Sequence, residues 1–429
     1  MSHRPLLLKG GRVVDPSQGL DGILDLLLVG GKVAALAESV DTPPDTVVME
    51  ADGLVVTPGL IDVHVHLREP GQEHKETIHS GAMAAAAGGF TAVCSMPNTV
   101  PPIDDPAAVG FVVAAGKKAG AARVYPMGAI SLGLKGEVLT EFGGLVEAGA
   151  VAVTDDGRPV MDSGLMRLAM EYAQAFDIPV VDHPEDLTLS RDGTMNEGLT
   201  SSRLGLKGKP NASEDIHILR DILLAELTGG RLHIQHVSTR LGVEAIRQGK
   251  ARGVRVTGEA TPHHLLLTDT AVDGYRTEAK MNPPLRSPED RDAVREGVKD
   301  GTLDVIATDH APHHYDEKEA AFDDAPNGIV GLETALGLVY GHLVEGGLMD
   351  LSTMVTRMSV TPARLFKLPG GTLAIGSPAD VTVFDPDAEW KVDPTAFLSK
   401  SRNTPFADWT LKGKPRCTIV DGQVVWEAE

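Results

Sequence analysis

Two histidines lie two positions apart in the apolar segment 61–68, whose sequence is IDVHVHLR. On an extended strand, residues i and i+2 point to the same face, so His64 and His66 can converge on one ion while Val63 and Val65 pack on the other side. Imidazole nitrogen suits divalent transition metals such as zinc. Because two histidines at this spacing also arise by chance, the pair must be weighed with the other polar residues.

Further carboxylates and histidines follow other apolar segments. Asp155 and Asp156 follow segment 150–154, His183 follows 179–182, His236 lies in 231–237, and Asp309 follows 303–308. If four imidazoles and two carboxylates meet at one end of the fold, they could hold two metal ions, with an open position for water between the ions. Two positive charges lower the pKa of such a water towards neutrality and make hydroxide available. His233 lies at odd spacing from His236 and is expected to face elsewhere, packed or behind the ligands.

The elements that must position these residues alternate through the middle of the chain. Apolar segments rich in β-branched residues are followed by helix-length segments, which is typical of βα units around a parallel sheet. Eight strands are expected, at residues 61–67, 91–96, 122–128, 150–154, 179–182, 231–237, 254–260 and 303–308. Eight such units predict a (β/α)8 barrel of TIM type, in which the chemistry lies at the C-terminal ends of the strands.

Two of the intervening helices have an apolar face that the spacing defines. Helix 161–176 is expected to bury Leu165, Leu168, Ala169 and Tyr172, and helix 213–227 to bury Ile216, Leu219, Leu223 and Leu227. Asp162, Ser163 and Ser213 are the expected N-caps.

Both ends of the chain have a different texture, with short apolar segments separated by glycine turns. Gly30-Gly31 suits a tight hairpin near one end, and Asp421-Gly422 marks a turn near the other. We therefore expect residues 1–58 and 371–429 to form one composite β-sandwich domain, and residues 59–370 to form the barrel. The fold class is α/β.

The composition argues against several classes of partner. The 429 residues include 39 Lys and Arg against 60 Asp and Glu, a net charge of −21. This sign disfavours binding to nucleic acids and to anionic membranes. Cys94 and Cys417 form no zinc-ligand or redox spacing and are expected to be small buried residues. The apolar segments are too short for a signal peptide or a membrane span, so a cytoplasmic location is expected.

The sequence resembles the amidohydrolase superfamily and, more narrowly, the class I dihydroorotases of the long bacterial type. The resemblance rests on HVHLREPG at 64–71, MPNT at 96–99, MNPPLR at 281–286, TDHAPH at 308–313 and GIVGLE at 328–333. It covers essentially the whole chain, and the first and fourth of these motifs are its most specific signals. It implies a zinc-dependent hydrolase that reversibly cyclises N-carbamoyl-L-aspartate to L-dihydroorotate in de novo pyrimidine biosynthesis.

The resemblance also implies a ligand set of two zinc ions per subunit. His64, His66 and Asp309 would hold one ion, His183 and His236 the other, and Asp156 would bridge them. A hydroxide between the ions would attack the ring amide carbonyl, and Asp309 would act as catalytic general acid and base.

The bridging residue separates this chain from some relatives. Hydantoinases and dihydropyrimidinases use a carboxylated lysine at the end of the fourth strand, but no lysine lies between Lys135 and Lys207. An aspartate bridge fits class I dihydroorotases instead. Asp155 stays open as an alternative to Asp156, because adjacent carboxylates differ by one step of register.

Substrate recognition needs a cation, because dihydroorotate carries a carboxylate that dihydrouracil lacks. Arg68 lies two residues after His66, and its guanidinium could grip a carboxylate through two hydrogen bonds. The structural alternative is a salt bridge between Arg68 and Glu69. By resemblance, Asn98 and His313 would share the carboxylate and Asn282 would contact the ring.

Two other functions are disfavoured. An allantoinase or hydantoinase is disfavoured by the missing bridge lysine and by Arg68. A silent structural partner of aspartate transcarbamoylase is disfavoured because every ligand is present, although an active chain could still bind that enzyme. A homodimer is expected. The acidic loop 314–330 follows a barrel strand, where a lid would lie, and it carries Asn327 where relatives often have a bulky apolar residue.

Overall fold

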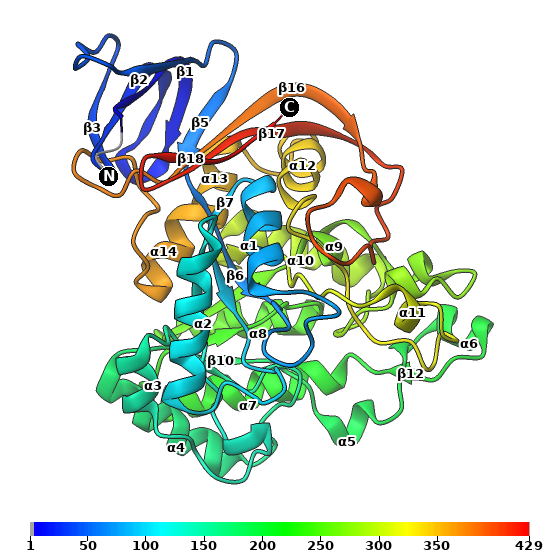
Figure 1. Cartoon of the computed structure of the whole chain (residues 1–429). Helices are drawn as coiled ribbons and strands as arrows, with labels where there is room; N and C mark the ends of the chain where they lie inside the picture. The colour runs from blue at the N-terminus through cyan, green and yellow to red at the C-terminus, as the bar shows by residue number, and fades with distance from the viewer. Residues whose placement is uncertain (1–3, 429) are drawn as a thin grey trace.

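The barrel is built from eight parallel strands in the computed structural model, which describes residues 4–428 (Figure 1). They are β6 (Leu60–Val65), β7 (Phe90–Ser95), β8 (Arg123–Pro126), β9 (Val153–Thr154), β10 (Val180–Asp182), β13 (Leu232–Ile234), β14 (Val256–Ala260) and β15 (Val305–Ile306). Strands β6 to β8 form one sheet, and β15, β14, β13, β10 and β9 another. Bridges between Gly128 and Val153 and between Val65 and His310 join the two sheets into a ring. Each strand overlaps one predicted segment, and the (β/α)8 barrel is confirmed.

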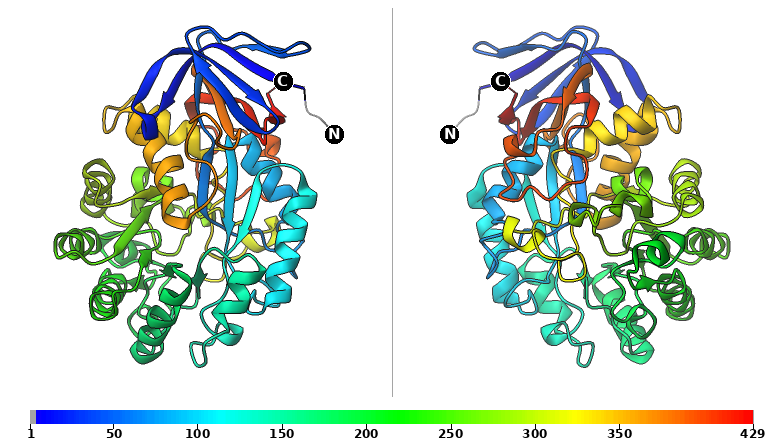
Figure 2. Two further views of the ribbon diagram at one scale, coloured as in Figure 1. Left: turned by 90° about the vertical axis from the view of Figure 1, so that its left-hand side faces the viewer. Right: turned by 90° about the vertical axis from the view of Figure 1, so that its right-hand side faces the viewer.

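Helices surround the strands as an outer ring (Figure 2). The longer ones are α1 (Ile78–Ala87), α2 (Pro106–Ala119), α3 (Phe142–Ala148), α4 (Ser163–Ala173), α7 (Ala212–Thr228), α8 (Arg240–Ala251) and α10 (Pro288–Asp300). Shorter ones are α5 (Leu187–Ser190), α6 (Leu199–Leu204), α9 (Pro262–Leu266), α11 (Tyr315–Lys318), α12 (Ala335–Val339), α13 (Leu351–Val355) and α14 (Thr361–Phe366). Two short strands, β11 (Met195–Asn196) and β12 (Gly208–Lys209), pair beside the barrel. Within residues 4–428, none of the helices combines the length and the apolar character that crossing a membrane requires.

Strands from both ends of the chain form one eight-stranded sheet. They are β1 (Leu6–Asp15), β2 (Leu20–Val29), β3 (Lys32–Ala37), β4 (Val47–Glu50), β5 (Val55–Pro58), β16 (Val381–Lys391), β17 (Thr410–Val420) and β18 (Gln423–Glu427). Strand β16 pairs with β5 and so joins the two ends. The buried carboxylate of Asp15 accepts a hydrogen bond from the backbone nitrogen of Leu373, at 2.7 Å. The sheet lies at the end of the barrel where the blue and red segments meet in Figure 1.

The prediction for the buried face of α4 was partly wrong. Its N-cap is Asp162, as expected, and the Asp162 carboxylate accepts from the backbone nitrogen of Leu165. Leu168, expected in the core, is exposed, and the fully buried residues are Met166, Ala169, Met170 and Ala173.

The prediction for α7 was wrong for its whole apolar face. The four residues expected in the core are exposed, and the helix begins at Ala212, so Ser213 is not its N-cap. The inner face carries Glu214, Asp215, His217 and Asp221 beside Ile218, Ile222 and Ala225. The buried polar groups have partners on distant elements, such as Arg286 for Glu214 and Asp182 for His217. Apolar spacing could not reveal these partners.

Candidate metal centre and substrate pocket

The side chains predicted as metal ligands come together at the C-terminal ends of the barrel strands, where all of them are buried. The Nε2 atom of His64 lies 3.4 Å from carboxylate oxygens of both Asp156 and Asp309. The Nε2 atom of His66 lies 3.1 Å from Asp309 Oδ1 and 3.6 Å from Asp156 Oδ2. Among these predicted ligands, two groups of three have ligand atoms close enough to share an ion: His64, Asp156 and His236, and His64, His66 and Asp309.

His183 lies beside these groups and belongs to neither. Its Nδ1 atom lies 2.8 Å from His236 Nε2 and 3.6 Å from Asp156 Oδ1. Its Nε2 atom faces Glu185 Oε2 at 3.3 Å and the amide nitrogen of Asn282 at 3.1 Å. His183 therefore touches the cluster through His236 and Asp156.

The two adjacent aspartates point in different directions. Asp155 accepts hydrogen bonds from the backbone nitrogens of Ile130 and Ser131 and from the Ser131 hydroxyl. Asp156 instead faces the histidines. Burial alone would raise the pKa of Asp156, but the neighbouring imidazoles of His183 and His64 hold it well below its ordinary value. Asp156 therefore presents an ionised carboxylate to the cluster, while the Asp155 carboxylate is tied to the preceding loop.

The donor set fits a divalent cation. Among the described residues, the buried atoms His64 Nε2 and His236 Nδ1 have no hydrogen-bond partner. Burial would raise the pKa of Asp309, but His64 and His66 hold it well below its ordinary value, so this carboxylate is ionised too. An unpartnered buried nitrogen is costly, and so is a buried anion. Imidazole and carboxylate donors of this kind suit zinc and related ions, which would satisfy both.

Glu259 holds His64 from behind and was missed in the sequence analysis. It stands near the end of β14, with Oε1 2.5 Å from His64 Nδ1 and Oε2 3.1 Å from His233 Nε2. A carboxylate on the second ring nitrogen is typical of metal-ligating histidines. His233 packs behind the ligands, as expected. Its signal in the sequence is a carboxylate near the end of the seventh predicted strand, 254–260.

A pocket of about 210 Å³ opens over the cluster. Pockets for drug-sized ligands measure roughly 300–1,000 Å³, so this pocket suits a molecule smaller than a typical drug. It is lined by predicted ligands together with all four predicted substrate-binding residues, Arg68, Asn98, Asn282 and His313, and by Asn327.

Arg68 brings a cation to this pocket. Its Nε donates to the carbonyl of Pro312 at 3.1 Å, and its Nη2 lies 3.3 Å from His313 Nε2. Burial lowers the pKa of Arg68 to about 10, so the guanidinium is charged at neutral pH. Among the described residues it forms no ion pair, because Glu69 instead accepts a hydrogen bond from the backbone nitrogen of Ile78. The guanidinium therefore has donor capacity left for an anion.

The two predicted asparagines line the pocket and also hold their neighbours. The Asn98 amide nitrogen donates a hydrogen bond to Asp156 Oδ2 at 2.9 Å, and Asn98 Oδ1 lies 3.0 Å from His66 Nδ1. The Asn282 side chain donates to Glu185 and accepts from Lys209, at 2.9 and 2.7 Å. Glu185 and Lys209 were not predicted, and Lys209 lies on β12, outside the pattern of strand ends.

Two buried lysines fix the loop beside the pocket. Lys280 Nζ donates to the carbonyls of Phe322, Asp323 and Ala325. Lys318 Nζ donates to the carbonyl of Pro326 at 2.9 Å. The next residue, Asn327, lies against His313, with its carbonyl 2.8 Å from His313 Nε2. The loop 314–330 thus forms part of the pocket wall.

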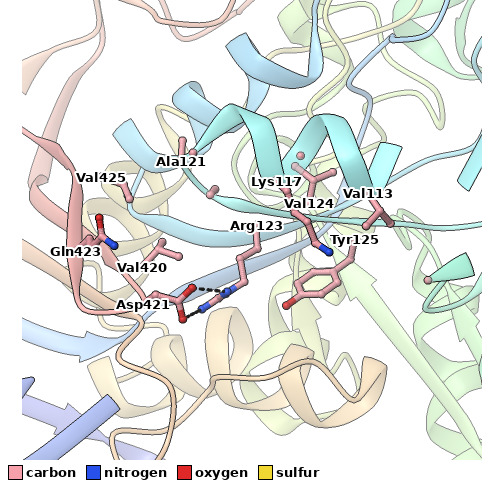
Figure 3. Close-up of a pocket in the computed structure, with 14 residues that line it drawn as sticks. Val113, Lys117, Ala121, Arg123, Val124, Tyr125, Val420, Asp421, Gln423 and Val425 are labelled. Carbon is pink, nitrogen blue, oxygen red and sulfur yellow. Dashed lines mark hydrogen bonds and ion pairs between the residues drawn. The ribbon is translucent and has the colours of Figure 1, made fainter. Parts of the chain in front are cut away.

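A larger cavity, of about 490 Å³, lies between α2, β8 and the β17–β18 hairpin (Figure 3). Its guanidinium, Arg123, is bound by the carboxylates of both Asp380 and Asp421. These ion pairs join the sheet to the barrel. None of the clustered histidines lines this cavity, so the chemistry belongs to the smaller pocket.

Comparison with known proteins agrees with this geometry. Residues 53–241 match the family described as dihydro-orotase-like, and residues 278–426 match the amidohydrolase family. Proteins named dihydroorotase from Syntrophotalea carbinolica and Anaeromyxobacter sp. strain K are 54% and 56% identical to this chain. The matches cover 98% of this chain in both cases, and 99% and 98% of those relatives.

Solved structures share the fold over its whole length. An L-hydantoinase from Arthrobacter aurescens superposes with a TM-score of 0.88 at 29% identity, covering 100% of this chain and 96% of that one. A dihydropyrimidinase from Brevibacillus agri, at 22% identity, has a TM-score of 0.83, covers 99% of this chain and 95% of that one, and shares the fold. The resemblance seen in the sequence motifs is confirmed: this chain belongs to the dihydroorotase family of the amidohydrolases.

Proposed function

We propose that this chain is a zinc-dependent dihydroorotase, which interconverts N-carbamoyl-L-aspartate and L-dihydroorotate. One observation carries the choice of substrate: Arg68, which has no ion pair among the described residues, lines the same small pocket as Asp309 and the histidines. A cyclic amide alone needs only the metal centre. A cyclic amide that also bears a carboxylate needs the cation as well.

Two metal ions are assigned to the cluster. His64, His66 and Asp309 would hold one and His183 and His236 the other, with Asp156 between them. When bound, such ions polarise a carbonyl and lower the pKa of water, so that a nucleophile exists near neutral pH.

Asp309 is placed to move the proton. Its carboxylate lies 3.1 Å from His66 at the floor of the pocket and is kept ionised by the neighbouring imidazoles. During ring opening it would accept a proton from the attacking water and deliver it to the ring nitrogen as the carbon–nitrogen bond breaks. In the biosynthetic direction it would take the proton from that nitrogen as the ring closes.

Arg68 would orient the substrate. Because its Nε is used by Pro312, the two terminal nitrogens are left to bind the substrate carboxylate. His313 beside it is neutral, since burial and the nearby cations lower its pKa far below the ordinary value. Its Nε2 faces the carbonyl of Asn327 at 2.8 Å, so this nitrogen carries the proton and could donate it to the substrate carboxylate instead. Asn98 would help to bind the carboxylate and Asn282 would contact the ring.

We also propose that the enzyme works in the cytoplasm as a homodimer. The composite sheet supports residues 1–58 with 371–429 as one structural unit and residues 59–370 as the other.

The substrate assignment is tested by rates with three cyclic amides, namely dihydroorotate, dihydrouracil and hydantoin. Of these three compounds, we expect the wild-type chain to turn over only dihydroorotate. Faster turnover of dihydrouracil or hydantoin, which lack the carboxylate, would refute the assigned role of Arg68 and favour a hydantoinase type of activity.

A further inference from the structure

A buried ion pair lies directly behind His183. Lys209 Nζ is 2.7 Å from Glu185 Oε1, and the two side chains are only 13% and 9% exposed. Glu185 follows β10, two residues after His183, whereas Lys209 ends β12, which lies beside the barrel (Figure 1). Taking two charges out of water can cost more than their attraction returns, so a buried ion pair is weak evidence for a role in stability. Its contacts indicate a role at the metal centre.

The two oxygens of the Glu185 carboxylate have different partners. Oε1 accepts a hydrogen bond from Lys209. Oε2 lies 3.3 Å from His183 Nε2 and accepts from the Asn282 amide nitrogen at 2.9 Å. A carboxylate beside one nitrogen of an imidazole holds the ring proton on that nitrogen and leaves the other nitrogen free to bind a metal ion.

The nitrogen that this contact leaves free on His183 is Nδ1. It faces His236 Nε2 at 2.8 Å and Asp156 Oδ1 at 3.6 Å. These are the partners with which His183 would hold the second ion of the proposed centre. The contact with Glu185 therefore turns the ring so that a free nitrogen points to this ion.

Lys209 also fixes the direction of the Asn282 amide. Lys209 Nζ donates to Asn282 Oδ1 at 2.7 Å, while the amide nitrogen donates to Glu185. The opposite orientation would place the amide oxygen against the carboxylate and the amide hydrogens against the ammonium group. Because Asn282 lines the pocket, the second amide hydrogen is what it can offer to a substrate.

The barrel holds Lys209 in place. The backbone carbonyl of Lys209 accepts hydrogen bonds from Arg286 Nη1 and from the backbone nitrogen of Glu197, both at 3.0 Å. Arg286 is buried and is paired with Glu214 on α7. The short β11–β12 sheet is thereby tied to the barrel at the residue that carries the ammonium group.

We propose that the Glu185–Lys209 pair is a positioning device for the reaction. It fixes the ring nitrogen that His183 offers to the second ion, and it fixes the amide group that Asn282 offers to the substrate. The proposal rests on the two-ion assignment of the proposed function. It adds that the short β11–β12 sheet beside the barrel is part of the active site.

The two ions would then have separate supports. Glu259 stands behind His64, a residue of the first ion's ligand set. Among the predicted ligands in the described part of the chain, Glu185 bonds only to His183. Loss of the Glu185–Lys209 pair should therefore weaken the second ion and leave the first ion bound.

The first experiment measures zinc binding to the metal-free chain by competition with a chromophoric chelator. Glu185→Gln and Lys209→Met each remove one partner of the pair, and the double variant removes both charges, so that neither is left buried alone. The controls are Asp192→Asn and Lys207→Met. Lys207 and Asp192 form a lysine–carboxylate pair nearby in the sequence, but their side chains are 59% and 74% exposed. Circular dichroism shows that each variant folds.

We expect the wild type and both controls to bind two zinc ions with the same affinities. Glu185→Gln, Lys209→Met and the double variant should bind one ion as tightly as the wild type and the other about 10- to 100-fold more weakly. Equal weakening of both ions, or two unchanged affinities, would overturn the proposal. So would a wild-type chain that binds a single ion. Two bound ions without turnover of dihydroorotate would instead contradict the proposed function alone.

A second experiment tests the action of Lys209 on Asn282, at zinc concentrations that fill both sites. Lys209→Met should raise the KM for dihydroorotate about 3- to 10-fold, the effect of one hydrogen bond, with a smaller change in kcat. If Lys209 acts through the amide, the KM of the double variant with Asn282→Ala should equal that of Asn282→Ala alone. Increases in KM that multiply in the double variant, or an unchanged KM in Lys209→Met, would refute this role.

Discussion

Glu259 Oε1 lies 2.5 Å from His64 Nδ1, and the other oxygen of the same carboxylate lies 3.1 Å from His233 Nε2. His64 is shared by the two groups of predicted ligands that could hold an ion at the strand ends. The contact fixes its ring so that Nε2 faces the cluster. Glu259 therefore positions the histidine on which both halves of the proposed centre depend.

We expect Glu259→Gln to reduce metal affinity and kcat/KM by about 10- to 100-fold, the usual effect of removing such a supporting group. Metal competition and initial rates measure the two effects separately. Glu244→Gln on α8 is the control, because the Glu244 carboxylate is about half exposed and accepts hydrogen bonds from Arg247 and Gln248 on its own helix. Wild-type affinity in Glu259→Gln would show that His64 needs no support.

Asp155 and Asp156 should differ in what they control. Asp156→Asn removes a charge from the cluster, so we expect loss of bound metal and of turnover. Asp155→Asn leaves the cluster intact but disturbs the hydrogen bonds from Ile130 and Ser131. It should lower the free energy of unfolding by about 1–3 kcal/mol. Elemental analysis measures bound metal and urea unfolding measures stability in both variants. If Asp155→Asn loses metal and Asp156→Asn keeps it, Asp155 and not Asp156 is the metal ligand.

Arg68→Ala should largely abolish turnover of dihydroorotate while metal content is unchanged. Two charge-assisted hydrogen bonds of roughly 1.5–3 kcal/mol each predict a loss of about 10²- to 10⁴-fold in kcat/KM. Arg68→Lys keeps the charge but loses the planar fork, so its activity should fall between the two. Loss of metal from Arg68→Ala would show that the residue is structural.

Lys318 should make stability depend on pH. Burial lowers its pKa to about 7, whereas the unfolded chain has the ordinary value of 10.5. Between these values the unfolded state binds more protons, so raising the pH favours the folded state. We expect the stability of the wild type relative to Lys318→Met to increase from pH 7 to about pH 10 and to be constant below pH 6. Lys299→Met, at an exposed position on α10, should show no such trend in urea unfolding.

The sequence was sufficient for the barrel and for most of the polar residues at its strand ends, because parallel strands bring their carboxyl ends to one edge, although Glu259 on β14 was missed. It could not orient Asp155 and Asp156, since their directions depend on amide groups at residues 130 and 131. It also missed the inward face of α7, where Glu214 is paired with Arg286, 72 positions away. Polar partners that are distant in sequence leave no periodic signal.

The central claim is tested most directly by the rate at which the purified chain alone consumes dihydroorotate as zinc is added back after chelation. We predict no turnover without metal and a rate that rises to a plateau at two equivalents per chain. Absence of turnover with two ions bound, or turnover that chelation leaves unchanged, would contradict the account.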